Sequence, residues 1–297
     1  MPATTRARRS ALYVPGSNTR ALDKGRTIAA DVLILDLEDA VAPAAKETAR
    51  GAVATAASAR AYGRREVVIR VNGLDTPWIA RDIAAAVASR PDAILIPKLS
   101  RIEDLRRARA ALTAAQAAPG LTLWAMIETP QAVLNVAHIA ELAKGPGAPL
   151  TCLVVGTNDL ARDTGVRLKP GRLALLPWLS AVVLAARANG LSVLDGTFNQ
   201  LNDWEGFHAE CEQGRDLGMD GKTLIHPRQV PIANEIFSPS TAEIEWAEKV
   251  VAAFARPENA GKAVIAVEGQ MVERLHLIVA ARTIETATAI LPAEPNS

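Results

Sequence analysis

Two acidic residues, Glu128 and Asp159, stand where apolar runs of the sequence end, LTLWAMIE and TCLVVGTND. An ionised carboxylate at the edge of a buried strand is costly unless a cation balances it. Two carboxylates on neighbouring strands, with positions left open for water and substrate oxygens, suit Mg²⁺. The spacing therefore predicts a metal site, and it leaves open an ion-pair network with Arg70 or Lys98 instead.

The elements that would position these residues are short apolar runs that alternate with helical stretches. The first six runs are rich in Val, Ile and Leu without in–out alternation, which is typical of parallel strands buried on both faces. Thr76-Pro77 and Thr129-Pro130 each predict a helix start, with a capping threonine before proline. This order predicts a (β/α)₈ barrel, with a doubly wound open sheet as the alternative. The runs are 11–16, 32–39, 66–72, 93–98, 121–128, 151–159, 191–196 and 221–227.

Polar residues collect at the carboxyl ends of all these runs, where a barrel places its active site. Exposure to water at the end of a strand would explain one or two such polar ends. Eight polar ends favour a ring of residues around one site. The residues at these ends are Ser17, Asn18, Asp36, Glu38, Asp39, Arg70, Asn72, Lys98, Glu128, Asp159, Asp195 and His226.

The composition is that of a globular protein, with 297 residues, 49% hydrophobic, 22% charged and a net charge of +1. Such a balance gives no reason to expect nucleic acid or membrane partners. Cys152 and Cys211 imply no disulfide framework, which fits a cytoplasmic location. We expect a disordered basic arm at 1–9, with a trimmed targeting peptide as the alternative. The barrel is expected at 10–238 and a C-terminal lid segment at 239–297.

Several stretches together resemble the HpcH/HpaI aldolase and citrate lyase beta-subunit superfamily, in its branch of CoA-ester lyases. The resemblance implies the barrel fold, Mg²⁺ or Mn²⁺, and a homotrimer or hexamer. It also implies reversible cleavage of a 3-hydroxyacyl-CoA, such as malyl-CoA or citramalyl-CoA, into an acyl-CoA (acetyl-CoA) and a 2-oxo acid. The stretches, which span 9–290 in order, are RSALYVPGSNTRALDKG, LDLEDAV, IRVNGLDTPW, ILIPKLS, MIETPQAV, GTNDLARD, DGKTLIHPRQV and FSPS.

By this resemblance Glu128 is the first metal ligand and Asp159 the second. Arg70 falls on the arginine that holds the 2-oxo acid, and a guanidinium can grip a carboxylate with two parallel hydrogen bonds. An ion pair of Arg70 with Glu38 or Asp39 is the structural alternative. Those two acids are expected beside the metal as a supporting shell, unless they form a solvated turn.

The resemblance also assigns residues that bind substrate. Gly156, Thr157 and Asn158 of GTND are expected to contact it. The start of the first helix is expected to hold CoA, because free N–H groups and the helix dipole attract phosphate. Asn18, Arg20 and Lys24 are the candidates there, although Lys24 also fits a solvated helix position. His226 is interpreted as a turn residue rather than a catalyst.

The C-terminal segment reads as a helix, two short strands around Glu268-Gly269, and a second helix. In the CoA-ester lyases such a tail is a lid over a neighbouring subunit's site, and an aspartate there serves as acid or base. Glu273 occupies that place here, and it also fits a helix N-terminal glutamate favoured by the dipole. Two alternatives to a free CoA-ester lyase stay open: a citrate lyase beta subunit acting on an acyl carrier protein, and a catalytically silent acyl-CoA-binding homologue.

Overall fold

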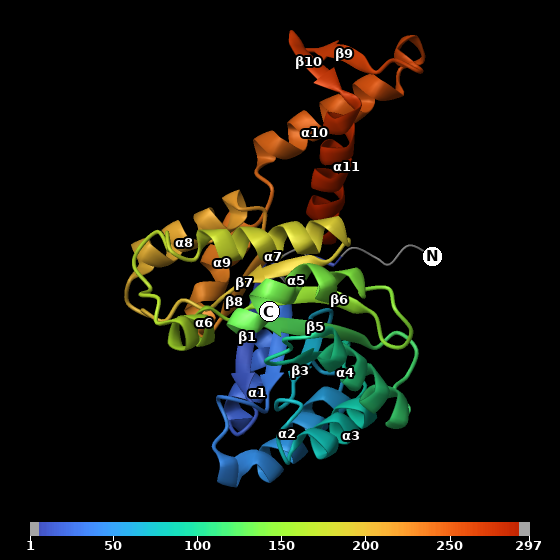
Figure 1. Ribbon diagram of the computed structural model, residues 1–297. Helices are drawn as coiled ribbons and strands as arrows, with labels where there is room; N and C mark the ends of the chain where they lie inside the picture. Colours follow the sequence, from blue (N-terminus) through green and yellow to red (C-terminus); the bar gives the residue numbers. More distant parts are fainter. Residues whose placement is uncertain (1–5, 291–297) are drawn as a thin grey trace. The chain divides into compact units, whose positions relative to one another are not determined.

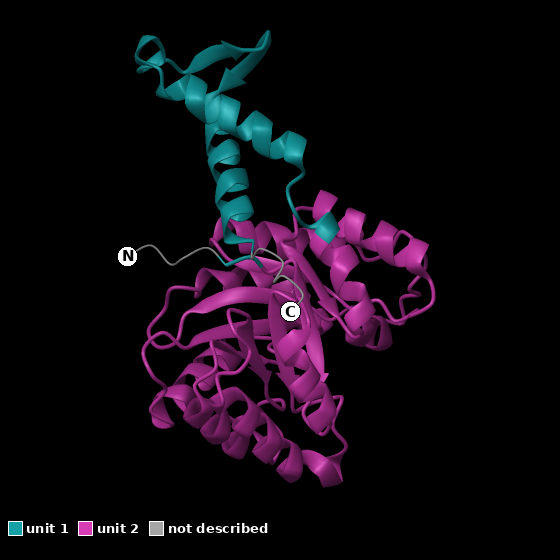
Figure 2. Ribbon diagram, turned by 180° about the vertical axis from the view of Figure 1, so that it is seen from behind, with its two compact units in different colours: residues 1–7, 235–297 teal, residues 8–234 magenta. Residues whose placement is uncertain are grey.

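The computed structural model describes residues 6–290 and divides the chain into two compact units. Residues 8–234 form the larger unit, and the described part of the smaller unit comprises residues 6–7 and 235–290 (Figure 2).

The larger unit is a closed barrel of eight parallel strands in sequence order (Figure 1). The ring closes because β1 pairs with β8 as well as with β2. This confirms the predicted (β/α)₈ barrel, and the open-sheet alternative is wrong. The strands are β1 (Ser10–Pro15), β2 (Val32–Asp36), β3 (Glu66–Arg70), β4 (Ala93–Ile96), β5 (Thr122–Ile127), β6 (Leu150–Val155), β7 (Ser192–Asp195) and β8 (Gly221–Leu224).

Helices follow the strands around the barrel, and their starts only partly match the sequence prediction. Thr129 caps α5, since its side chain accepts a hydrogen bond from the backbone N–H of Ala132. Thr76 caps no helix, because its hydroxyl donates to the carbonyl of Gly73 and α3 begins three residues later. The helices up to residue 236 are α1 (Thr19–Lys24), α2 (Lys46–Ser58), α3 (Ile79–Ser89), α4 (Ile102–Ala114), α5 (Pro130–Glu141), α6 (Thr157–Thr164), α7 (Leu176–Ala188), α8 (Trp204–Asp216) and α9 (Val230–Ile236).

Inward-facing side chains of the strands fill the barrel as a packed core. Burying each large aliphatic or aromatic side chain contributes roughly 1.5–3 kcal/mol, so the filled interior stabilises the ring that carries the site. The cluster comprises Ala11, Val32, Ile34, Val68, Ala93, Leu95, Trp124, Met126, Cys152, Val154 and Leu194.

The end of the barrel where the strands begin is crossed by Arg8. Its guanidinium donates two hydrogen bonds to Glu66, at 2.7 and 2.8 Å, and one to the hydroxyl of Ser192 at 2.9 Å. The same group lies 4.8 Å from the ring centre of Trp124, within the range of a cation–π contact. Arg8 therefore joins three strands and the core across the barrel floor.

Arg9 is also fixed to the barrel. Its guanidinium donates to both oxygens of Asp31, at 2.8 and 2.7 Å. Both Arg8 and Arg9 lie within the segment that we expected to be a disordered arm. That expectation is wrong for these two residues, because each finds a buried carboxylate partner.

The described part of the smaller unit consists of α10 (Thr241–Ala255), β9 (Val264–Val267), β10 (Gln270–Glu273) and α11 (Arg274–Ala289). The two strands form an antiparallel hairpin as predicted, and Glu268 and Gly269 at its turn both have positive φ, 49° and 80°. Two such residues are typical of the tightest hairpin turns. Within residues 6–290, no helix is both long and apolar enough to cross a membrane. The unit has its own apolar cluster, built from Ala247, Val250, Ala253, Ile265, Val267, Val272 and Ala280.

Candidate active site

Glu128, the residue that follows β5, is a fully buried carboxylate at the end of the barrel strands. Its Oε1 accepts a hydrogen bond of 2.7 Å from the backbone N–H of Lys98. Its Oε2 is buried and finds no hydrogen-bond partner among the described residues. Burial raises the pKa of Glu128 to about 8, and the nearby carboxylates of Glu38 and Asp159 add to the rise. The positive charge of Arg70 acts in the opposite direction but does not offset these effects, so the site holds an acid whose ionised form is not fully compensated.

Gly156 is the residue that makes room for this acid. A β-carbon at position 156 would lie 2.3 Å from the Cβ of Glu128 and 2.7 Å from its Oε2. Such a contact is far inside van der Waals distance, and the two residues directly follow β5 and β6. Gly156 thus leaves the space that the carboxylate of Glu128 occupies.

We expect Gly156→Ala to displace the Glu128 side chain and to destabilise the protein by about 1–3 kcal/mol through overpacking. Differential scanning calorimetry measures the loss of stability, and calorimetric titration with Mg²⁺ measures the damage to the site. The matched control is Gly51→Ala in α2, where a new β-carbon meets nothing within 4 Å. Equal melting temperatures and Mg²⁺ affinities of the Gly156 variant and the wild type would contradict the close packing.

Asp159 lies in the first turn of α6 and pairs with Arg162 at 2.7 Å. Its charge contributes to the raised pKa of Glu128, so the two predicted metal ligands lie close enough to repel each other. Within residues 6–290, no group of three or more His, Cys, Asp or Glu side chains is placed to hold a metal. The unpartnered oxygen of Glu128 and the pair of carboxylates fit a hard divalent cation such as Mg²⁺, which completes its shell with water and ligand oxygens.

Arg70, at the end of β3, is held mainly by Asp36, which pairs with it across the β2–β3 ladder. Nε and Nη2 of Arg70 donate to the two oxygens of Asp36, each at 2.7 Å, and the guanidinium lies 4.7 Å from the ring centre of Tyr13. Burial raises the pKa of Asp36, but Arg70 and the backbone N–H groups of residues 38 and 40 together more than offset it, so the pKa lies below its ordinary value. Nη1 contacts Glu38 at 3.0 Å and Asp39 at 3.2 Å.

Asp36 changes the predicted role of Arg70. One edge of the guanidinium is already occupied by a carboxylate of the protein, so the two-bond grip on a ligand that we expected is not available at that edge. Nη1 is the one nitrogen of the guanidinium that does not bond Asp36, and it contacts Glu38 and Asp39 instead. The sequence had marked Asp36 only as one of many polar strand ends, and the strand register is the information that identifies it as the partner of Arg70.

Glu38 connects Arg70 to Lys98. Its Oε1 accepts a hydrogen bond of 2.7 Å from Nζ of Lys98, and its Oε2 lies 3.0 Å from Nη1 of Arg70. Burial raises the pKa of Glu38 despite both cations. The side chain of Asp39 is 57% exposed, so Glu38 is built into the site, whereas Asp39 largely faces solvent. The ammonium of Lys46 holds this loop by donating to the carbonyls of residues 37 and 38, each at 2.7 Å.

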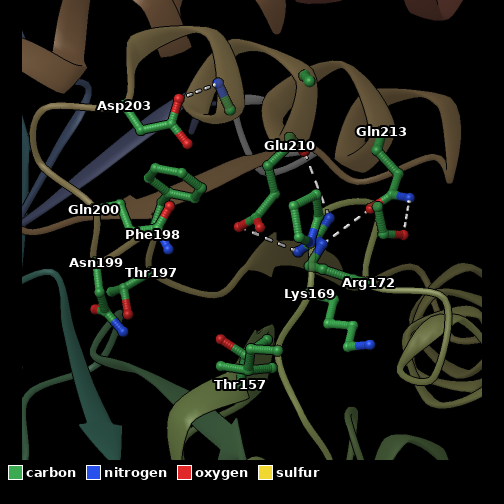
Figure 3. Close-up of a pocket in the computed structure, with 15 residues that line it drawn as sticks. Thr157, Lys169, Arg172, Thr197, Phe198, Asn199, Gln200, Asp203, Glu210 and Gln213 are labelled. Carbon is green, nitrogen blue, oxygen red and sulfur yellow. Dashed lines mark hydrogen bonds and ion pairs between the residues drawn. The ribbon is translucent and has the colours of Figure 1, made fainter.

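A cavity of about 180 Å³ lies between the residues that follow β6 and β7 and the helix α8 (Figure 3). Thr157 and Phe198 are among the residues that line it, together with Arg172 and Glu210. Glu128, Asp159 and Arg70 are not among them, and the link to the site is Thr157, which follows Gly156 in the sequence. Asn158 links the two loops, since its side chain bonds that of Asn199 at 2.7 Å.

A buried ion network closes the inner wall of this cavity. Asp195 at the end of β7 accepts hydrogen bonds from Arg172, at 2.7 and 2.8 Å, and from Nζ of Lys222 at 2.7 Å. Lys222 also donates to Glu210 of α8 at 2.7 Å. Asp195 and Lys222 are fully buried. The network therefore ties the loop before α7 to two strands and one helix.

The remaining residues of the predicted site make no described contact with the carboxylates at the end of the barrel. The side chain of Asn18 caps α1 by accepting from the N–H of Ala21 at 3.0 Å, and Arg20 and Lys24 are exposed. Nδ1 of His226 accepts the N–H of residue 228 at 3.1 Å, which fits the predicted turn role. Glu273 stands at the N-cap of α11 in the smaller unit, so its catalytic role stays a prediction.

The balance of charge defines what the site can do. Its carboxylates outnumber the cations that contact them, so a divalent cation would restore neutrality and then attract an anionic oxygen ligand. The arrangement suits binding and polarising a small acid that bears a second oxygen next to its carboxylate. The acids are Asp36, Glu38, Asp39, Glu128 and Asp159, and the contacting cations are Arg70, Lys98 and Arg162.

Comparison with known proteins gives close relatives over nearly the whole chain. A (3S)-malyl-CoA thioesterase from Cereibacter sphaeroides is 51% identical over 282 residues, which are 95% of each chain. An L-malyl-CoA/beta-methylmalyl-CoA lyase from Rhodobacter capsulatus is 34% identical over 296 residues, 92% of each.

A solved structure is similar as well. Protein CitE from Mycobacterium tuberculosis, in complex with magnesium, acetoacetate and coenzyme A, has a TM-score of 0.74 and 29% identity, and the match covers 95% of this chain and 98% of that one. Residues 9–227 match the family described as HpcH/HpaI aldolase/citrate lyase. This protein therefore belongs to the HpcH/HpaI aldolase/citrate lyase family.

Proposed function

We propose that the protein is a divalent-metal-dependent enzyme that acts on the CoA thioester of a small 3-hydroxy dicarboxylic acid of the malyl-CoA type. The observation that carries this proposal is the buried Glu128 carboxylate with one unpartnered oxygen, close to Asp159 and beside Arg70. Hydrolysis of the thioester is the proposed principal reaction, supported by 51% identity with a (3S)-malyl-CoA thioesterase.

Different side chains of the barrel would bind the metal ion and the acid end of the substrate. Glu128 and Asp159 would hold Mg²⁺ or Mn²⁺, which supplies the positive charge that polarises the hydroxyl and carboxylate oxygens of the substrate. Arg70 presents Nη1 to the bound acid, while Asp36 fixes the guanidinium. Glu38 orients both Arg70 and Lys98.

In hydrolysis, a water oxygen adds to the thioester carbonyl carbon and the water gives up one proton. The carbon–sulfur bond then breaks, and the sulfur leaves and takes up a proton to form the CoA thiol. The products are the free hydroxy diacid and CoA. The barrel residues hold the far, hydroxy-acid end of the substrate during this reaction, so they set specificity and orientation.

Carbon–carbon cleavage, the reaction that the sequence motifs led us to expect, is the second candidate. The charged groups gather where the hydroxy-acid end would bind, which favours chemistry at that end, and a malyl-CoA lyase is 34% identical. Here the C3 hydroxyl loses its proton and the C2–C3 bond breaks. The electron pair passes into the thioester enolate, which is protonated at C2 to give acetyl-CoA, and C3 becomes the carbonyl of glyoxylate.

Product analysis separates the candidates. Purified protein is mixed with malyl-CoA and citramalyl-CoA with and without Mg²⁺, and the products are followed by chromatography and by a thiol reagent. Free thiol with malate means hydrolysis, and acetyl-CoA with glyoxylate means carbon–carbon cleavage. Turnover that requires an acylated carrier protein would favour the citrate lyase beta-subunit alternative, and no turnover of any thioester would overturn the enzymatic proposal.

The proposed roles of the remaining residues complete the scheme. Asn18, Arg20 and Lys24 would hold the phosphates of CoA. Residues 239–297 would act as a lid, and in a trimer or hexamer a neighbouring subunit would supply this lid.

Glu273 is proposed to move the proton near the thioester. We expect Glu273→Gln to lower turnover about 10²-fold or more while Mg²⁺ affinity stays unchanged, as steady-state kinetics and calorimetry measure. An unchanged rate would reduce Glu273 to a helix cap.

A further inference from the structure

Arg70 alone offers an incomplete grip for the carboxylate of the substrate. Asp36 accepts from Nε and Nη2, and both of its oxygens also accept backbone N–H groups of the same loop. This edge of the guanidinium is therefore committed to a buried aspartate. A ligand carboxylate that meets Nη1 needs a second cationic donor if it is to be held by two points.

Lys98 supplies such a donor beside Nη1. The two oxygens of Glu38 span the gap between the cations, since Oε1 accepts from Nζ of Lys98 at 2.7 Å and Oε2 lies 3.0 Å from Nη1 of Arg70. The two cations are thus close enough for one carboxylate, here that of Glu38, to contact both. An ammonium carries three donors, and Glu38 uses one of them. The side chain of Lys98 is 41% exposed, compared with 8% for Arg70, so it can reach a ligand at the mouth.

The backbone of Lys98 fixes this placement. Its φ of 52° lies in the left-handed region, and its N–H is aimed at Oε1 of Glu128 at 2.7 Å. A residue with a β-carbon rarely adopts this conformation, and such strain is concentrated at functional sites. Glycine would satisfy the backbone equally well. What lysine adds at this position is the ammonium group, held next to both Glu128 and Glu38.

We infer that Nζ of Lys98 and Nη1 of Arg70 together bind the substrate carboxylate that adjoins the hydroxyl-bearing carbon. The inference rests on the proposed function, because it assigns the recognition of the malyl group within that same site. Lys98 is then a substrate-binding residue that selects acids with a carboxylate at this end, whichever bond of the substrate is broken.

The test measures binding of a small acid separately from turnover. Pyruvate is titrated calorimetrically into protein saturated with Mg²⁺, and Mg²⁺ affinity is measured in parallel. Lys98→Met removes the charge and keeps the chain length. Lys98→Gly removes the side chain, keeps the N–H that bonds Glu128, and relieves the backbone strain, so it guards against misfolding of the first variant. Lys144→Met, at an exposed lysine in the loop before β6, is the control.

We expect both Lys98 variants to bind pyruvate about tenfold or more weakly, since a charge-assisted hydrogen bond is lost. Their Mg²⁺ affinity is expected to stay within about twofold of the wild type, and Lys98→Arg is expected to recover part of the pyruvate affinity. Unchanged pyruvate binding in both variants would overturn the inference. If the wild type turns over malyl-CoA in that case, the proposed function survives alone. Lys98-dependent pyruvate binding without turnover of any thioester supports the inference and refutes the function.

Discussion

Replacing Glu128 with glutamine is expected to abolish Mg²⁺ binding and to lower turnover about 10³-fold, because a Lewis acid supplies several kcal/mol of charge stabilisation. The metal-free variant is expected to melt at the same temperature as the wild type or higher. In the folded wild type, burial and two neighbouring acids disfavour the ionised form of Glu128, and the pKa of about 8 expresses that cost. A neutral side chain of the same shape removes the cost together with the metal ligand.

Two measurements check this expectation. Calorimetric titration gives the Mg²⁺ affinity, and thermal unfolding with and without Mg²⁺ gives the stability. Glu141→Gln, at an exposed residue that ends α5, serves as the matched control and should behave as the wild type. A Glu128 variant that still binds Mg²⁺ with near-normal affinity would refute its assignment as a ligand. A large fall in the metal-free melting temperature would refute the argument from unpaired charge.

Replacing Asp195 with asparagine is expected to destabilise the protein by about 3–5 kcal/mol, because it leaves buried cations without their shared partner. Lys222 and Asp195 are both fully buried, and Arg172 donates two hydrogen bonds to the same carboxylate. Urea unfolding measures the loss. Asp216→Asn at the exposed end of α8 is the control and should change stability by less than about 0.5 kcal/mol.

The pH dependence of this loss has a definite sign. Burial raises the pKa of Asp195, but Lys222 and Arg172 outweigh it, so the pKa in the folded protein lies below the ordinary value. The stability that Asp195 contributes is therefore present above its unfolded pKa of about 3.9 and is lost as the pH falls toward the folded value. The gap between wild type and variant should be widest at neutral pH and shrink below about pH 4. A gap independent of pH would contradict the ion network.

A double variant tests whether the charges act together. Removing Lys222 as well, in Asp195→Asn with Lys222→Met, takes away one of the two cations that lose Asp195 as a partner. Arg172 can then pair with Glu210, which already lies 3.5 Å from it. The double variant is expected to lose less than the sum of the two single variants, by about 0.5–3 kcal/mol of coupling. Strict additivity would mean that the two residues act independently.

Much of the barrel could be predicted from hydrophobic pattern alone. Strands that are buried on both faces must be continuous apolar runs, so local sequence is enough to predict where they occur and in what order. The same reasoning placed Glu128 and Asp159 at the ends of two adjacent strands. Glu128 directly follows β5, whereas Asp159 lies in the first turn of the helix that follows β6. Helix starts were less predictable. Thr129 and Thr76 carry the same Thr-Pro pattern, but the hydroxyl of Thr76 is taken up by a local turn.

The sequence offered an ion pair of Arg70 with Glu38 or Asp39, and both contacts form, but it did not indicate Asp36 as the main partner of Arg70. Asp36 and Arg70 meet because of the strand register, which no local pattern states. Lys98 is predicted as a polar strand end and a possible ion-pair partner, but its positive φ is not predictable from a residue type that disfavours this conformation. Arg8 and Arg9 looked like a basic tail because charged residues are usually solvated, and only their carboxylate partners across the barrel reveal otherwise.

The bonds of Arg8 also set an order of events during synthesis of the chain. Its partner Glu66 emerges from the ribosome 58 residues later, but Ser192 follows only after 184 residues. Arg8 must therefore wait for β7 before all of these hydrogen bonds can form. In a nascent chain that ends before β7, the barrel cannot close at the end where its strands begin. Ring closure is then a late, non-local step, of the kind that slows folding and exposes half-built barrels to chaperones and proteases.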